Sequence, residues 1–253
     1  MRIPALAIAL VLAFAAATPA AAERLVFALS SHRVLINSSF SGAELVLFGT
    51  VEPNGAERQN PDYDVVVTVT GPKQDVVTRQ KERVLGIWVN ADSRTFIDTP
   101  AYLAVLSNRE IDAIANRDTQ RRLQIGIDNT VISGDSGGIA NTDPFRAAFL
   151  RLNRQHGLYR EDSKGVTFLT PNLFRAGIQL PANSPIGIYR VEVRLFLDGK
   201  LLASQDSALE IVKVGFEQFV ASAARDHGFI YGLATVGLAI MTGWLAAVVF
   251  RRD

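Results

Sequence analysis

The sequence of 253 residues contains no cysteine, and this absence excludes several kinds of structure. Disulfide bonds, thiolate metal sites and lipid anchors on cysteine all need a thiol group. Histidine is scarce as well, with three residues in the chain. No histidine stands with acidic residues at the spacing of a zinc site, and no glycine-rich loop between a strand and a helix offers a phosphate cradle. We therefore predict neither a metal site nor a bound cofactor.

An excess of charge of one sign is also lacking. The chain has 26 lysine and arginine residues against 25 aspartate and glutamate residues, which gives a formal net charge of +1. Nucleic-acid binding needs a concentrated basic surface, because the phosphate backbone dominates the affinity. The composition therefore gives no reason to expect a nucleic acid as a partner.

The N-terminus, MRIPALAIALVLAFAAATPAAAE, has the form of a secretory signal peptide. Arg2 precedes the apolar stretch 3–17, and Ala20 and Ala22 provide a cleavage site of the A-x-A type. The stretch is short for a retained anchor, which needs about 20 apolar residues. We predict that residues 1–22 are removed and that the mature chain begins at Glu23.

The uncharged run from Gly228 to Phe250 predicts a transmembrane helix over residues 228–250. At about 1.5 Å of rise per residue, it is long enough to cross the hydrocarbon core of about 30 Å. Tyr231 and Trp244 are candidate anchors at the membrane interface. Four small residues stand at the spacing of helix-packing motifs, namely Gly228, Gly232, Ala239 and Gly243. They predict close approach of another helix, with the ordinary glycine content of a spanning helix as the alternative.

The charges beside this span predict its orientation. Arg251 and Arg252 follow the span directly, whereas residues 225–227 on its other flank are mixed in sign. The positive-inside rule therefore places residues 251–253 in the cytoplasm, which agrees with export of the N-terminus. A large exported domain without disulfides favours a bacterial periplasm. We expect a single-pass protein of the bacterial inner membrane with its main domain in the periplasm.

Residues 23–212 read mainly as short strands. Runs rich in valine, isoleucine, phenylalanine and threonine alternate with turn signals, and Asp198-Gly199 is a hairpin signal. The sequence from Pro185 to Tyr189 resembles the tyrosine corner of immunoglobulin-like sandwiches, so Tyr189 is expected to be structural. Trp88, on a predicted strand, is expected to fill the core rather than to recognise a partner.

Two helices are predicted between residues 99 and 160. The first has Pro100 at its start and covers residues 101–117; the second starts at Asp143 and Pro144 and ends before Gly157. A further amphipathic helix is predicted beside the membrane, over residues 213–227. The expected fold is α+β and mainly β: an immunoglobulin-like antiparallel β-sandwich with a helical insertion near 99–160, plus one C-terminal transmembrane helix.

The pentapeptide GDSGG at residues 134–138 matches the surroundings of the nucleophilic serine in chymotrypsin-like proteases. Such a site needs a histidine and then an aspartate earlier in the chain. Only His32 precedes Ser136, and it lacks the sequence context of that family. A surface loop that needs positive φ explains the glycines more simply. We predict no catalytic residue, and a serine hydrolase that uses Ser136 is the remote alternative.

Two charged groups near the second helix are candidates for ion binding. Arg146, Arg151 and Arg154 are interpreted as a solvated helix face, with an anion-binding patch as the weaker alternative. Oxygen ligands for Ca²⁺ could come from Asp128, Asn129, Asp135, Asn141 and Asp143. Their spacing does not match a calcium-binding loop, and such residues are common in turns, so a solvated loop is favoured.

Five segments together resemble a family of alphaproteobacterial transmembrane proteins with a periplasmic β-rich domain. They are SGAELVLFGTV (41–51), GIWVN (86–90), FRAAFLRLNRQHGLY (145–159), LPANSPIGIYRVEVRLFLDGK (180–200) and YGLATVGLAIMTGWLAAVVFRR (231–252). None of these segments is a catalytic signature. The resemblance implies no established activity and no transferable functional residue. It implies that a permease resembling sulfite exporters often accompanies the protein.

The leading functional hypothesis is a non-enzymatic, membrane-anchored periplasmic domain that acts as an accessory or assembly partner of an integral membrane protein. The expected partners are the lipid bilayer and that integral membrane protein. The alternative is a periplasmic module that binds or senses a small anion.

Overall fold

The computed structural model describes residues 23–52, 62–130, 133–134, 137–138, 143–215 and 224–249. The predicted signal peptide (1–22) and cytoplasmic tail (251–253) lie outside these residues. So does 216–223, which is the larger part of the helix predicted over 213–227. The described chain is mainly β with several short helices and one C-terminal apolar helix, as the sequence predicts.

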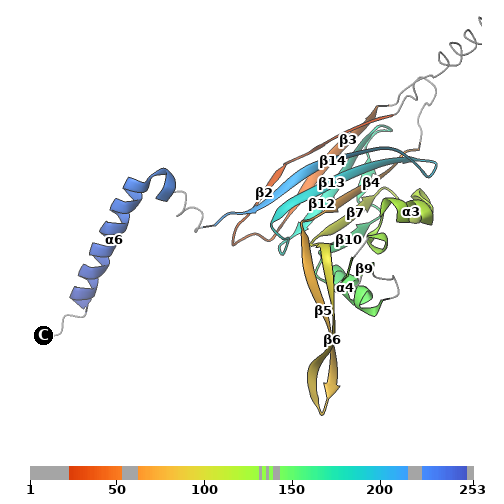
Figure 1. Ribbon diagram of the computed structural model, residues 1–253. Helices are drawn as coiled ribbons and strands as arrows, with labels where there is room; N and C mark the ends of the chain where they lie inside the picture. Colours follow the sequence, from red (N-terminus) through yellow and green to blue (C-terminus); the bar gives the residue numbers. More distant parts are fainter. Residues whose placement is uncertain are drawn as a thin grey trace, which may run out of the picture.

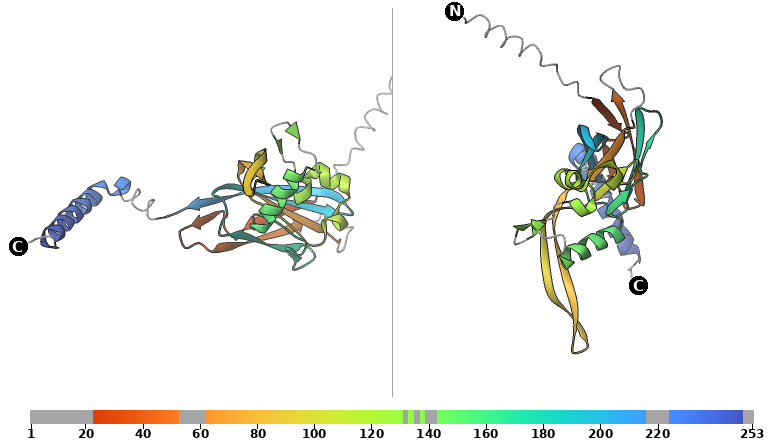
Figure 2. Two further views of the ribbon diagram at one scale, coloured as in Figure 1. Left: turned by 90° about the horizontal axis from the view of Figure 1, so that it is seen from below. Right: turned by 90° about the vertical axis from the view of Figure 1, so that its right-hand side faces the viewer.

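Two sheets face each other and enclose the main core (Figures 1 and 2). The four-stranded sheet has the order β1 (Arg24–Leu29), β3 (Gly42–Glu52), β12 (Leu173–Pro181), β11 (Val166–Phe168). The six-stranded sheet has the order β10 (Tyr159–Asp162), β7 (Leu103–Ser107), β4 (Asp64–Thr70), β13 (Gly187–Leu197), β14 (Lys200–Lys213), β2 (Arg33–Ile36). We call these two sheets the sandwich.

The alternation of strand residues explains the core between the sheets. In β12, Phe174, Ala176, Ile178 and Leu180 are buried while the residues between them are exposed or half-buried. Successive side chains of a strand point to opposite faces, so this period of two places one apolar face on the opposing sheet. Strand β4 is buried on both faces, because helices cover the outer side of the six-stranded sheet. Its uninterrupted DVVVTVT sequence fits that central position.

The six-stranded sheet is not purely antiparallel. Strand β10 runs parallel to β7, and β2 runs parallel to β14, whereas the other described pairs of this sheet are antiparallel. The antiparallel sandwich is therefore confirmed in its main part. Its immunoglobulin-like topology stays a prediction.

The helix predicted over residues 101–117 is wrong in its first half. Residues 103–107 form β7, which lies between β10 and β4 and is fully buried. A short apolar run buried on both faces has no periodicity that separates a strand from a helix. The helical part begins at α2 (Ile111–Ile114) and continues through α3 (Arg117–Leu123), the 3₁₀ turn η1 (Ile127–Asn129) and α4 (Pro144–Gln155).

Helix α4 follows its sequence signals closely. The Asp143 side chain accepts a hydrogen bond from the amide of Phe145 at 2.9 Å, and Pro144 occupies the first turn. Gly157 follows the helix with φ of 70°, the left-handed conformation that favours glycine there. Phe145 and Phe149 are buried against the six-stranded sheet, so the predicted second helix is confirmed.

Tyr189 is structural, as predicted. Its ring is fully buried, and its hydroxyl donates a 2.7 Å hydrogen bond to the carbonyl of Pro185 four residues earlier. Burial raises the pKa of the hydroxyl above its ordinary value.

A third sheet contains a long hairpin that projects from the sandwich (Figure 1). Its order is β5 (Lys73–Val84), β6 (Ile87–Pro100), β8 (Ser133–Gly134), β9 (Gly137–Gly138). The expectation that Trp88 fills the core is wrong, because Trp88 lies near the free end of this hairpin and is 69% exposed. The GIWVN segment has the composition of a core strand, but it begins at the turn between β5 and β6.

Candidate functional site

Helix α6 (Gly228–Val249) is apolar around its whole circumference. It has 22 residues and a mean hydropathy of 1.9 in its most apolar window, and none of that window is buried by the rest of the protein. A helix that is hydrophobic on all sides needs an apolar environment. Its length of about 33 Å matches the hydrocarbon core of a bilayer. The helix coincides with the span predicted over residues 228–250.

The small residues of α6 gather on one side of the helix. At 3.6 residues per turn, a sector about 100° wide holds Gly228, Gly232, Thr235, Ala239, Thr242, Gly243 and Ala246. We call this sector the small face. The opposite side carries the bulkier Leu233, Ile240, Trp244 and Val248, with Gly237 among them. Both threonine hydroxyls donate to carbonyls four residues earlier, at 2.8 and 2.7 Å, so they need no polar partner.

The small face leaves room for another helix. Apart from the chain neighbours and the backbone of α6 itself, no described atom lies within 4 Å of a Cβ built on Gly228, Gly232 or Gly243. Small residues let two backbones approach closely, and packing of this kind drives association in lipid. Of the predicted interface anchors, Tyr231 lies in the first turn of α6 and Trp244 in its last third. Arg251 and Arg252 lie outside the described residues.

The three arginines proposed for anion binding are only partly brought together. Arg146 is 5% exposed, and its guanidinium donates to the carbonyls of Asp128 and Thr130 at 2.9 and 3.1 Å. Burial lowers the pKa of Arg146. Arg154 pairs with the Asp128 carboxylate at 3.0 Å, and a cavity of about 250 Å³ lies between these groups. Arg151 is exposed and lies about 140° around α4 from Arg146.

The negative charge of Asp128 weakens the attraction of this cavity for an added anion. The carboxylate of Asp128 already pairs with Arg154, and its negative charge also acts on the nearby Arg146. The backbone carbonyls that Arg146 holds belong to η1 and the residue after it, so this side chain fastens the 3₁₀ turn to α4. The anion-binding patch stays a prediction.

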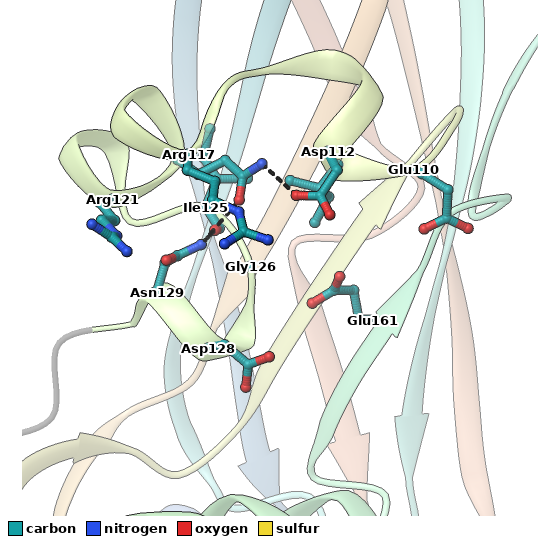
Figure 3. Close-up of a pocket in the computed structure, with 11 residues that line it drawn as sticks. Glu110, Asp112, Arg117, Arg121, Ile125, Gly126, Asp128, Asn129 and Glu161 are labelled. Atoms are coloured by element: carbon teal, nitrogen blue, oxygen red, sulfur yellow. Dashed lines mark hydrogen bonds between the residues drawn. The ribbon is translucent and has the colours of Figure 1, made fainter. Parts of the chain in front are cut away.

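A polar cavity of about 370 Å³ lies among α2, α3, η1 and β10 (Figure 3). Four carboxylates and two guanidinium groups line it, from Glu110, Asp112, Asp128, Glu161, Arg117 and Arg121. Several of these groups already have partners in the protein. The Gln120 amide donates to Asp112 at 2.8 Å, and Glu161 accepts from the amide of Ile127 at 3.2 Å.

The residues around this cavity limit its chemistry. The described lining contains no serine, threonine, cysteine, histidine or lysine, so it offers no hydroxyl, thiol, imidazole or amine nucleophile. No group of three or more metal-ligating side chains is found among the described residues. The hydrogen bonds of the lining residues join α2 to α3, α3 to η1 and η1 to β10, which is a structural use of the polar groups.

The described residues of the GDSGG segment, Gly134, Gly137 and Gly138, belong to β8 and β9 at the edge of the third sheet. Ser133 and Gly134 pair with Gly138 and Gly137, and β8 also pairs with β6. Asp135 and Ser136 themselves lie outside the described residues, so the serine hydrolase alternative stays untested. His32 is exposed beside β2, at one edge of the six-stranded sheet, and therefore belongs to a different sheet from GDSGG.

The candidate calcium ligands are divided in the same way. Asp135 and Asn141 lie outside the described residues. Asp143 caps α4, Asp128 pairs with Arg154, and the Asn129 amide donates to the carbonyl of Ile125 at 2.7 Å. Each described member thus has a structural partner.

A comparison with protein families decides the identity of the chain. Residues 24–252 match the family described as "Putative transmembrane protein (Alph_Pro_TM)". The chain belongs to this family. The match covers the sandwich, the third sheet and α6 together, so the β-rich domain and the apolar helix of this chain both lie within the matched region. The resemblance seen in the sequence and the prediction of a single-pass membrane protein are confirmed.

Other comparisons add little to the Alph_Pro_TM assignment. None of the curated proteins compared with the chain matches it. Among solved structures, the N-terminal domain of a Streptococcus gordonii adhesin is similar, with a TM-score of 0.28 and 9% identity over 75% of this chain. A Clostridium perfringens family 123 glycoside hydrolase is similar with a TM-score of 0.21 and 8% identity over 76% of this chain. The chain spans 32% and 28% of their lengths, and at these TM-scores neither carries an inference about it.

One candidate site is not evident from the sequence, namely the free end of the β5–β6 hairpin. The residues from Val84 to Trp88 are all exposed there, and four of the five are apolar and larger than alanine. A signal was present, because Gly86 interrupts the strand-like run VLGIWVN. The residue before it is leucine rather than the asparagine or aspartate that usually marks a two-residue turn, which hid the turn.

Proposed function

We propose that this member of the Alph_Pro_TM family is a non-enzymatic, membrane-tethered periplasmic domain. It acts as an accessory or assembly partner of an integral membrane protein of the bacterial inner membrane, such as a permease resembling sulfite exporters. In this proposal α6 makes the contact within the bilayer, and the sandwich acts on the periplasmic side.

The observation that carries the proposal is the division of α6 into a small face and a bulky face. A helix that serves only as a tether needs apolar residues but no particular order among them. In α6 a side free of bulky residues runs from Gly228 to Ala246, almost the full length of the helix, although three further small residues lie elsewhere on it. Because lipid tails are as apolar as leucine, helices in a membrane associate through close packing, which a continuous small face favours.

The test compares glycine substitutions on the two sides of α6. Gly232→Leu combined with Gly243→Leu fills the small face, whereas Gly237→Leu makes the same change about 140° around the helix from Gly232. Each full-length variant is crosslinked in native membranes, and the proteins bound to it are identified by mass spectrometry. We expect the double variant to lose the membrane proteins that the parent captures and the Gly237→Leu control to retain them.

A second exchange tests the same idea without assuming which positions matter. Replacing residues 228–249 by polyleucine keeps the length and the apolar character of the span but removes the small face. If the polyleucine chain captures the same membrane proteins as the parent, α6 is only a tether and the proposed helix contact is wrong.

A further inference from the structure

The β5–β6 hairpin ends in an apolar surface that no described residue covers. We call Val84–Trp88 the apolar tip. Leu85 is 100% exposed, Ile87 65% and Trp88 69%. Apolar side chains of this size seldom cluster at the end of a projecting hairpin, because each of them exposes hydrophobic area to water. The cluster therefore points to a binding surface.

The residue at position 85 is also not the type that the backbone conformation of the tip favours. Leu85 and Gly86 form a two-residue turn in which both φ angles are positive, 50° and 87°. The hairpin of β13 and β14 makes the same turn with Asp198 and Gly199, at 50° and 78°. A bulky apolar residue is rare in this conformation, whereas aspartate and asparagine tolerate it. Leucine at position 85 thus adds an exposed apolar group where the turn itself favours a polar residue.

The root of the hairpin is held firmly while its outer part is free. Phe96 is fully buried, and its ring lies 5.0 Å from the ring of Phe149 on α4. Thr78 and Phe96 are the last buried residues on the two strands before the tip. From Arg79 to Leu85 the outer part extends by about 20 Å at 3.3 Å per residue. The tip therefore stands well away from the sandwich on a fixed support.

Basic residues lie directly behind the apolar tip. Arg83 is the cross-strand partner of Trp88, and Lys81 is the partner of Asn90, so both basic side chains share the face of Trp88. No ion pair among the described residues involves Arg79, Lys81 or Arg83. An indole at the end of a strand with basic groups behind it matches the layers of a membrane surface, where tryptophan lies among headgroups and lysine and arginine reach the phosphates.

The size of the tip favours a bilayer over a protein as its partner. A stable protein interface uses about 20 residues or more on each side, and the apolar tip has five. Insertion of a small apolar group into a bilayer has no such requirement when the protein is already tethered there, because the tether raises the effective concentration. The 14 residues 214–227 between β14 and α6 can span at most about 50 Å, which keeps the hairpin near the membrane.

We propose that the apolar tip inserts into the surface of the same bilayer that α6 spans. Leu85, Ile87 and Trp88 enter the boundary between headgroups and acyl chains, and Lys81 and Arg83 contact lipid phosphates. The domain is then held at two points, which fixes its orientation toward the membrane. This inference rests on the membrane anchor and does not require the proposed protein partner.

The test uses the full-length chain with Trp88 as its only tryptophan. The sequence contains two tryptophans, so Trp244→Phe leaves Trp88 as the single reporter. The protein is reconstituted into vesicles of phosphatidylcholine and phosphatidylglycerol, with and without brominated acyl chains. We expect the fluorescence of Trp88 to be emitted at a shorter wavelength than in the unfolded protein in water. We also expect brominated lipid to quench this fluorescence and iodide in the aqueous phase to leave it unquenched.

Two variants separate insertion from folding. Leu85→Asn keeps the turn, as Asp198 does at the corresponding position, and removes the central apolar group; it should abolish quenching by brominated lipid. Leu169→Asn makes the same change at an exposed loop between β11 and β12 on the sandwich, and quenching should remain. A circular dichroism spectrum with the parent's strand signal verifies the fold of both variants.

Three results would overturn the inference. Trp88 could be quenched by iodide and untouched by brominated lipid, or Leu85→Asn could leave the lipid quenching unchanged. Protection of Trp88 in native membranes but not in pure lipid vesicles would mean that a protein covers the tip instead. The glycine variants of α6 should not alter the quenching, so failure of the proposed helix contact and failure of this inference are distinguishable.

Discussion

At the scale of single residues, three buried tyrosines combine packing with hydrogen bonding. Tyr102, Tyr159 and Tyr189 are each at most 2% exposed, and each hydroxyl donates a 2.7 Å hydrogen bond to a backbone carbonyl. The rings of Tyr102 and Tyr189 are 5.6 Å apart in a tilted arrangement. Burial raises the pKa of Tyr102 to about 12 and shifts the pKa of the other two in the same direction. All three hydroxyls therefore stay protonated to a higher pH in the folded chain than in the unfolded chain.

This leads to a prediction about stability in alkali. An unfolded tyrosine loses its proton near pH 10, whereas folded Tyr102 keeps it to about pH 12. The unfolded state then binds fewer protons, so the free energy of unfolding falls as the pH rises above 10, by about 1.4 kcal/mol per pH unit for each such tyrosine. The contribution is fully present below pH 10.

Tyr102→Phe isolates one of these contributions. At pH 8 it should lower the free energy of unfolding by about 1 kcal/mol, because the hydrogen bond to the Gln179 carbonyl is lost. Between pH 10 and 12 the gap to the parent should close and then reverse, since the parent loses about 1.4 kcal/mol per pH unit through Tyr102 whereas phenylalanine does not titrate. Urea unfolding of the full chain in detergent, followed by circular dichroism at several pH values, measures the gap; a constant gap would contradict the assignment.

At the scale of structural elements, two hairpins make the same turn with different sequences. Asp198-Gly199 joins β13 to β14 on the sandwich, and Leu85-Gly86 joins β5 to β6 at the apolar tip. Both non-glycine residues have φ of 50°. The left-handed conformation disfavours a bulky side chain by about 1–2 kcal/mol, and aspartate or asparagine reduces that cost by local hydrogen bonding. The β5–β6 hairpin is therefore less stable with leucine at position 85 than it would be with asparagine or aspartate there.

Reciprocal substitutions test this reading of the turns. Leu85→Asn should raise the free energy of unfolding by about 1 kcal/mol, and Asp198→Leu should lower it by a similar amount. Thermal unfolding of both full-length variants in the same detergent provides the comparison. Destabilisation by Leu85→Asn would mean that Leu85 makes contacts that stabilise the hairpin, which its complete exposure contradicts.

The same elements explain what the sequence could predict. Helix α4 was predictable because Asp143, Pro144 and Gly157 mark its ends and its apolar residues recur at helical spacing. Strand β7 was mistaken for a helix because a run buried on both faces carries no period. The hairpin tip was missed because Leu85 does not look like a turn residue. The small face of α6 was recognised at four of its positions, since GxxxG spacing is local in sequence.

In the whole molecule, α6 holds a β-rich domain at a membrane, and we propose the apolar tip as a second contact with it. The family match from residue 24 to 252 joins the domain and the helix in one unit. The sandwich has its own core, and its outer face carries helices that bury a second core, so the domain does not depend on α6 for its packing. This division leaves the small face of α6 available to a partner.

The proposed topology is tested most directly by determining on which side of the bilayer the β-rich domain and the C-terminus lie. The chain has no cysteine, so a single introduced cysteine reports unambiguously on its own site. Lys200→Cys places a thiol on the exposed β13–β14 turn region, and Asp253→Cys places one after α6. If the domain is periplasmic and the C-terminus cytoplasmic, a membrane-impermeant maleimide will label Lys200→Cys in intact spheroplasts. It will label Asp253→Cys only after lysis. Labelling of both before lysis, or the reverse pattern, would contradict this topology.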